Sequence, residues 1–145
     1  MPDVHDKKTR SYNMSRIRSK DTKPEILVRK YLFSKGFRYR IHDSKLPGTP
    51  VLVFPMYKTA LFIHGCFWHG HARCKYFVIP KTRTEWWLNK ITKNKLRDKE
   101  NYLRLKTLNW EVFTVFECEL IDAEQISTLT NLLENLKKIP KTFNG

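Results

Sequence analysis

The sequence predicts a mixed α/β domain in which helices pack against a central sheet. Its 145 residues fit one domain, and a hydrophobic share of 41% with 13% aromatic residues excludes a disordered chain. Segments with helical periodicity are interleaved with segments that alternate or are continuously apolar, which favours the α/β class. We expect residues 1–20 to form a basic N-terminal arm and residues 21–145 to form the single domain.

The first predicted helix follows the arm, which is itself expected to be helical around residues 12–18. Thr22 and Glu25 have the Thr-x-x-Glu spacing of a capping box, and Pro24 is tolerated in the first turn. Gly36 provides the stop signal. The apolar stripe of this helix consists of Leu27, Val28, Tyr31 and Leu32.

Three strands are predicted next. In residues 37–41 apolar side chains alternate with arginines, as they do in a half-buried strand. Residues 43–50 are rich in turn formers, and two short apolar runs at 51–54 and 59–63 then predict a hairpin around 55–58.

The rest of the chain, from residue 64 on, predicts an irregular loop, a helix, a strand and a helix. Residues 64–74 are dense in His, Cys and aromatic side chains, and the Thr-x-x-Glu motif of residues 82–85 predicts a capped basic helix that ends near Leu108. Residues 110–116 are almost continuously apolar, which favours a strand buried on both faces. The last helix is expected to begin at Asp122. Its apolar stripe consists of Ile126, Leu129, Leu133 and Leu136.

The charge distribution favours a polyanionic partner. The net charge is +14, from 28 Lys and Arg against 14 Asp and Glu, and the basic residues concentrate in 1–40 and 81–106. Solvated helix faces would account for part of this excess, but a basic surplus confined to the first 106 residues favours nucleic acid. No apolar run approaches the length of a membrane span, and the N-terminus lacks the apolar segment of a signal peptide.

The three cysteines favour a zinc site over a disulfide framework, because they are odd in number. Cys66 and Cys74 bracket His69 and His71, and Cys118 follows the predicted fourth strand. Three thiols and one imidazole form the closed, tetrahedral ligand set of a structural zinc site. The spacing is not that of a zinc finger, so three free cysteines are the alternative, and the spacing leaves both histidines open as the ligand.

Aromatic side chains gather beside the same cluster. Phe67 and Trp68 adjoin Cys66, while Trp86 and Trp87 open the basic helix. Core packing would account for most of them. Beside basic residues, however, such side chains can also wedge between base pairs or stack on bases.

The loop motif resembles the signature of the very short patch repair (Vsr) endonuclease family. The run His-Gly-Cys-Phe-Trp-His-Gly-His covers residues 64–71 and is followed by Cys74. Further matching segments are 3–6, Met14 with Ile17, 46–50, 80–82, 85–87, and 117–118. The resemblance extends over about residues 3–120.

The resemblance implies a restriction-endonuclease-like core that contains a structural zinc site. It also implies a nickase that recognises the T·G mismatch left by deamination of 5-methylcytosine and cuts on the 5′ side of the mispaired T, before a polymerase resynthesises a short patch. The implied cofactors are structural Zn²⁺ and catalytic Mg²⁺. The implied partner is mismatched double-stranded DNA, with mismatch-repair and polymerase proteins as candidate protein partners. We expect a monomer in the bacterial cytoplasm, associated with the nucleoid and not with a membrane.

The resemblance also implies roles for individual residues. The zinc ligands would be Cys66, His71, Cys74 and Cys118. That leaves His69 as general base or water-orienting group, and further active-site positions correspond to His64, Glu25 and Asp98. The intercalating aromatics would be Phe67, Trp68 and Trp87. Lys90 and Asn94 would face the mispaired base, and Met14 and Ile17 would lie along the minor groove.

One departure from the family motif concerns the catalytic metal. The motif Pro-Gly-x-Pro-Asp ends in the principal Mg²⁺ ligand, but residues 47–51 end in Val51, which has no side-chain oxygen. Ile63 replaces a threonine, where the metal contact would be a main-chain carbonyl. A second hypothesis is therefore a catalytically impaired mismatch- or duplex-DNA-binding protein of the same fold. A third, a zinc-stabilised RNA-binding protein, rests on charge and aromatics alone.

Overall fold

The computed structural model describes residues 21–141, so the expected arm, with Met14 and Ile17, lies outside the described residues. Within that range the expected order of elements is confirmed. The elements are α2 (Lys23–Ser34), β1 (Arg40–Ile41), β2 (Leu52–Phe54), the 3₁₀ turn η1 (Pro55–Tyr57), β3 (Thr59–His64), α3 (Thr84–Thr107), β4 (Glu111–Phe116), the 3₁₀ turn η2 (Glu117–Leu120) and α4 (Glu124–Lys137). None of these helices is long and apolar enough to cross a membrane.

The four strands form one mixed sheet in the order β1-β2-β3-β4. β1 pairs with β2, and β2 with β3, in antiparallel orientation, whereas β3 and β4 are parallel. Parallel neighbours need a long crossover, which here contains the loop after β3 and the helix α3. In the β3–β4 register Ile63 lies beside Val115 and His64 beside Phe116.

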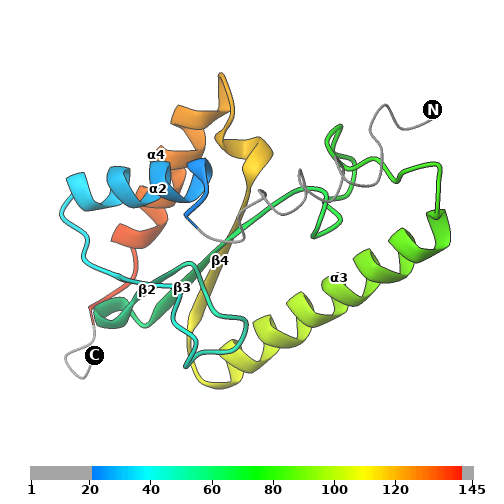
Figure 1. Ribbon diagram of the computed structural model, residues 1–145. Coiled ribbons are helices and arrows are strands. Elements are labelled where there is room, and N and C mark those ends of the chain that lie inside the picture. Colours follow the sequence, from blue (N-terminus) through cyan, green and yellow to red (C-terminus); the bar gives the residue numbers. More distant parts are fainter. Residues whose placement is uncertain (1–20, 142–145) are drawn as a thin grey trace.

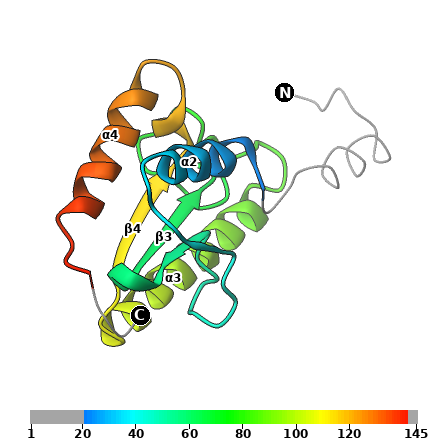
Figure 2. The same cartoon turned by 90° about the vertical axis from the view of Figure 1, so that its left-hand side faces the viewer.

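Helices cover both faces of the sheet. α2 and α4 lie together on one face, and α3 runs along the other (Figures 1 and 2). Because side chains alternate along a strand, Leu61 of β3 joins the larger core under α2 and α4, while Ala60 and Phe62 join a smaller cluster with Leu105 of α3. The class predicted from the sequence, a mixed sheet flanked by helices, is confirmed.

The prediction that the strand at 110–116 is buried on both faces is wrong. In β4 only Val115 is buried. β4 is an edge strand, and the side chains of Val112, Thr114 and Phe116 border a cavity on the α3 side, although Val112 also packs against the smaller cluster. The first strand is also shorter than expected, since β1 contains only two residues and both are exposed.

The first capping prediction is half right. Thr22 Oγ1 accepts a hydrogen bond from the Glu25 N–H at 3.4 Å. The reciprocal bond of a capping box is replaced, because the Glu25 carboxylate accepts from the N–H of Asp21 at 2.6 Å. The Glu25 carboxylate therefore binds the main chain of Asp21, the residue before the N-cap Thr22.

The starts of α3 and α4 also differ from the prediction, and α4 begins at Glu124 instead of Asp122. α3 begins at Thr84 after Arg83 in a left-handed conformation (φ 56°), without a side-chain cap, so the capping box at 82–85 is wrong. In α4 the buried side chains are Leu129, Leu132, Leu133 and Leu136. Ile126, which was expected in the stripe, is 75% exposed. Gln125 and Thr128 hydrogen-bond to η2. Ile126 lies on nearly the same side of the helix as the buried Leu133, two turns later, so its exposure comes from its place at the start of the helix and not from its angular position.

Candidate functional site

A cavity of about 410 Å³ lies between α3, the ends of β3 and β4, and the turn before β2. It brings together side chains from five parts of the chain that are far apart in sequence. The predicted site residues that line it are Glu25, Val51, Ile63, His64, His69 and Asp98.

Two histidines and one aspartate form the polar wall of this cavity. His64 is the last residue of β3, His69 lies in the loop that follows, and Asp98 lies in the middle of α3. His69 Nδ1 is 2.6 Å from Asp98 Oδ2, and the rings of His64 and His69 are stacked with centroids 3.8 Å apart. With Asp98 accepting the hydrogen on Nδ1, the basic nitrogen of a neutral His69 is Nε2.

The position of His64 in this pair keeps its ring neutral. Burial, followed by the neighbouring His69, lowers the pKa of His64 to about 4, against the opposing effect of Asp98. His64 is therefore neutral near pH 7, and Asp98 serves His69 as hydrogen-bond acceptor.

One face of α3 supplies further cavity residues that the sequence analysis did not single out. Lys95, Lys99 and Tyr102 line the cavity together with Asp98. Their spacing of three and four residues is the signal that could have found them, because such positions share one face of a helix. Two lysines beside the histidines make this wall attractive to an anion.

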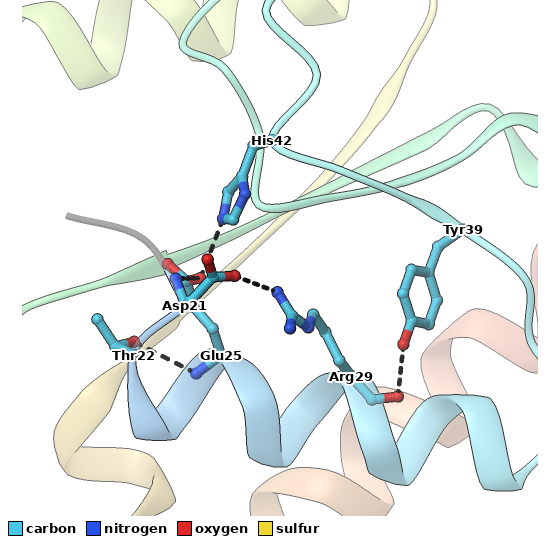
Figure 3. Close-up of polar contacts among 6 residues, drawn as sticks. All are labelled: Asp21, Thr22, Glu25, Arg29, Tyr39 and His42. Carbon is cyan, nitrogen blue, oxygen red and sulfur yellow. Dashed lines mark hydrogen bonds and ion pairs between the residues drawn. The ribbon is translucent and has the colours of Figure 1, made fainter. Parts of the chain in front are cut away.

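Glu25 reaches the cavity from the first turn of α2. The residue is 3% exposed, and its Oε2 lies 3.0 Å from His42 Nε2 (Figure 3). His42 was also missed, although it directly follows the predicted strand at 37–41. The pair joins the start of α2 to the end of β1.

The donors around Val51 do not fit a catalytic Mg²⁺. Val51 is 8% exposed, packs in the larger core and presents only carbon to the cavity. The carboxylates among the described cavity residues are Glu25, held by His42 and the Asp21 N–H, and Asp98, held by His69. Mg²⁺ requires several oxygen ligands in a near-octahedral arrangement, and no carboxylate stands at the strand position.

The second cluster can hold a metal ion. Its donors are Cys66, His71, Cys74 and Cys118, and the ligand atoms all lie within 4.8 Å of one another. Zinc bonds of about 2.3 Å to sulfur and 2.0 Å to nitrogen place tetrahedral ligands about 3 to 4 Å apart, so this donor set fits Zn²⁺. The sequence left two histidines open. The structure places His71 in the cluster, 3.4 Å from Cys118 Sγ, and His69 beside Asp98.

Two features of the cluster bear on metal binding. The His71 ring is held against Phe116 of β4, with stacked centroids 3.9 Å apart. Burial, with hydrogen bonds to the other two thiols, raises the pKa of Cys118 to about 12, so without a cation this thiol keeps its proton. A metal ion would replace these protons and cross-link the loop after β3 to η2.

The aromatic side chains form a separate cluster at the loop and the start of α3. The ring centroids of Phe67 lie 5.2 Å from Trp68 and 5.3 Å from Trp87, and those of the two tryptophans are 5.8 Å apart. All three residues are half-buried and belong to neither hydrophobic core. Asn94 Nδ2 donates to the main-chain oxygen of Trp68 at 2.8 Å, while Lys90 lies exposed one turn earlier.

Gly70 allows this loop to lie close against α3. It adopts φ +60°, and a Cβ there would lie 2.7 Å from Ile91 Cγ2 and 2.8 Å from Lys95 Cδ. The close approach sets Trp68 and His69, which are consecutive in the chain, beside α3, where they contact Asn94 and Asp98 respectively. The aromatic cluster, the cavity and the Cys/His cluster thus all take residues from the loop that follows β3.

Comparison of the sequence with known proteins finds a matching family model and several similar proteins. The model of the family described as DNA mismatch endonuclease Vsr matches residues 2–75. The chain is 51% identical over 120 residues to the "Type II nicking enzyme V.NmeAIP" of Neisseria meningitidis serogroup A, covering 83% of this chain and 85% of that protein. It is 46% identical over 136 residues to the "DNA mismatch endonuclease Vsr" of Escherichia coli K12, covering 92% and 86%. Identity to the "Type II nicking enzyme V.XorIIP" of Xanthomonas oryzae pv. oryzae is 44% over 126 residues, covering 86% and 92%.

Proposed function

Because the chain belongs to the Vsr family of DNA mismatch endonucleases, we propose that it is a DNA nicking endonuclease that recognises a T·G mismatch and cuts on the 5′ side of the mispaired T. The observation that carries this proposal is the adjacency of two sites in one loop. Trp68 belongs to the aromatic cluster and the next residue, His69, belongs to the polar wall of the cavity. A side chain inserted beside a mismatch would therefore bring the neighbouring phosphodiester toward the cavity.

The cavity supplies an oriented base. Asp98 accepts the Nδ1 hydrogen of His69, which leaves Nε2 to take a proton from the attacking water. His64, neutral near pH 7, limits the motion of the His69 ring by stacking on it. General-base catalysis of this kind contributes about 10²- to 10⁴-fold to a rate.

The aromatic cluster supplies the means of recognition. Phe67, Trp68 and Trp87 would insert beside the mismatch, where a wobble pair is easier to unstack than a matched pair. Lys90 and Asn94 would face the mispaired base, with Asn94 also holding the main chain of Trp68. Lysines of α3 that border the cavity would neutralise phosphates.

The wider setting is part of the same proposal. The mixed sheet is a restriction-endonuclease-like core, the Cys/His cluster holds a structural Zn²⁺, and residues 1–20 contact the minor groove through Met14 and Ile17. The enzyme works as a monomer on nucleoid DNA in the cytoplasm, ahead of polymerase and mismatch-repair proteins.

Val51 favours a second candidate function, a catalytically impaired mismatch- or duplex-DNA-binding protein. Mg²⁺ is the catalytic cofactor implied for the family, and the donors around Val51 do not fit it. Losing one strong electrostatic contribution typically costs about 3 kcal/mol, or on the order of a hundredfold in rate. DNA binding would persist, because the basic and aromatic residues do not depend on position 51.

A nicking assay separates these candidates. A T·G duplex and its matched counterpart are incubated with the wild-type chain in Mg²⁺ and in EDTA, beside Val51→Asp and His69→Ala. We expect weak nicking by the wild type. The nicking rate of Val51→Asp should be about a hundredfold higher, and His69→Ala should not nick. Strong Mg²⁺-dependent nicking by the wild type would refute the impairment and support the nickase. Failure of Val51→Asp to nick, with mismatch binding retained, would leave the binding protein as the function. If RNA competes for the protein as effectively as mismatched duplex DNA does, both candidate functions are excluded.

A further inference from the structure

A third group of metal-binding side chains lies beside the cavity, apart from the His64–His69–Asp98 wall and the Cys/His cluster. Asp21 precedes α2, Glu25 lies in its first turn, and His42 follows β1. One carboxylate oxygen from each acid and one imidazole nitrogen all lie within 4.8 Å of one another. Figure 3 shows the Glu25 carboxylate between Asp21 and the His42 ring.

The group contains a buried carboxyl group. The Glu25 side chain is 4% exposed and the His42 side chain 18%, so water contributes little to their solvation. Asp21 adds a second carboxylate and Arg29 a guanidinium, with Arg29 Nη1 2.8 Å from Asp21 Oδ1 (Figure 3). Two carboxylates and an imidazole whose ligand atoms lie within 4.8 Å of one another form a mixed oxygen and nitrogen set that a first-row dication accepts.

The imidazole is held in place by its own backbone. His42 has a left-handed conformation (φ 46°), which is strained for a residue with a side chain. Its N–H donates to the carbonyl of Val51 at 3.0 Å, and this bond keeps His42 against the segment that leads into β2. The ring position is therefore determined before any ligand arrives, as in preorganised metal sites.

We propose that Asp21, Glu25 and His42 bind one divalent transition-metal ion, of the class of Mn²⁺ or Co²⁺, at the edge of the cavity. The imidazole nitrogen decides the class, because Mg²⁺ takes oxygen ligands whereas first-row transition metals accept mixed nitrogen and oxygen sets. The ion takes the place of the hydrogen between His42 Nε2 and Glu25 Oε2. Arg29 keeps its bond to Oδ1 of Asp21.

Three protein ligands leave coordination positions for water or for an oxygen of a bound anion. Glu25 lines the same cavity as Val51, whose side chain offers no ligand. The site therefore places a cation next to Val51, where the chain departs from its family. This site would prefer a transition metal, whereas the family position is expected to hold Mg²⁺. The inference concerns metal binding alone and holds whether or not the chain nicks DNA.

The test is a calorimetric titration of the full chain, with zinc present in the Cys/His cluster, by Mn²⁺ and in parallel by Mg²⁺. We expect one Mn²⁺ per chain, bound at least about tenfold more tightly than Mg²⁺. His42→Ala and Glu25→Gln each remove a ligand, and should weaken Mn²⁺ binding at least about tenfold. His42→Gln keeps a donor for Glu25, so the fold is preserved. It should lose the preference for Mn²⁺ while its affinity for Mg²⁺ changes by less than about threefold.

Two matched controls locate the ion. Asp43→Asn removes an exposed carboxylate next to His42 whose oxygen is bonded within its own turn, to the Lys45 N–H. His69→Ala disrupts the other His and Asp group of the cavity. Both should bind Mn²⁺ as the wild type does. The proposal is overturned if the wild type binds no Mn²⁺ at millimolar concentration, if His42→Gln keeps the wild-type preference, or if His69→Ala abolishes binding.

Discussion

Replacing His64 by glutamine should make the stability of the protein less dependent on pH between about 6.5 and 4. The pKa of His64 falls from its usual 6.5 to about 4 in the native state, because of burial first and then the neighbouring His69 ring, with Asp98 opposing. As the pH drops below 6.5, the unfolded chain takes up a proton on this ring and the native protein does not. The contribution of neutral His64 to stability is complete above pH 6.5 and is lost as the pH falls toward 4.

The magnitude follows from the two pKa values. A difference of about 2.5 units corresponds to about 3 kcal/mol of unfolding free energy, most of which is lost by about pH 4.5. Urea unfolding followed by circular dichroism, at about pH 7 and about pH 4.5 and in saturating zinc, gives this loss for each protein. His64→Gln retains the other acids, histidines and thiols, so their common contribution cancels in the comparison.

The expected result is that His64→Gln loses about 2 to 3 kcal/mol less than the wild type over this interval, whatever its stability at pH 7. Parallel losses in the two proteins would show that His64 titrates normally in the native state. The stacked arrangement with His69 would then not hold His64 in its neutral form.

Three further predictions test other parts of the structure. One Zn²⁺ per chain should be measured by metal analysis, and a chelator or Cys118→Ala should lower the melting temperature, whereas purified protein free of zinc with unchanged stability would contradict the site. Trp68→Ala should reduce the ratio of mismatched to matched duplex affinity about three- to tenfold, and Lys99→Ala, at a lysine that borders the cavity, should weaken both duplexes about equally in a salt titration; an unchanged ratio for Trp68→Ala would exclude the wedge. Gly70→Ala should destabilise the fold by about 1 to 3 kcal/mol in urea unfolding, because its Cβ would lie 2.7 Å from Ile91 Cγ2 at φ +60°, and wild-type stability would show that the loop can move away from α3.

The order and kind of the elements could be predicted because each carries a local signal. The alternation at 37–41, the short apolar runs of the hairpin and the long basic helix all depend on neighbours within a few residues. The errors concern burial and helix starts. β4 was expected to be buried on both faces, but an apolar run does not reveal that it lies at a sheet edge beside a cavity. Ile126 fits the helical stripe, yet it is exposed because the first turn of α4 binds η2 through other residues.

The sequence by itself determined the family signature at 64–74, the excess of basic residues and the valine at position 51, because these are properties of residue identity and spacing. Only the tertiary structure decided which histidine joins which group. His69 and His71 are equivalent by spacing, but the loop turns so that His69 meets Asp98 of α3 and His71 meets Cys118. The pairing of Glu25 with His42 likewise spans 17 residues and exists because α2 and the end of β1 pack together. Contacts between distant segments depend on how the sheet and helices assemble, and no local pattern encodes that geometry.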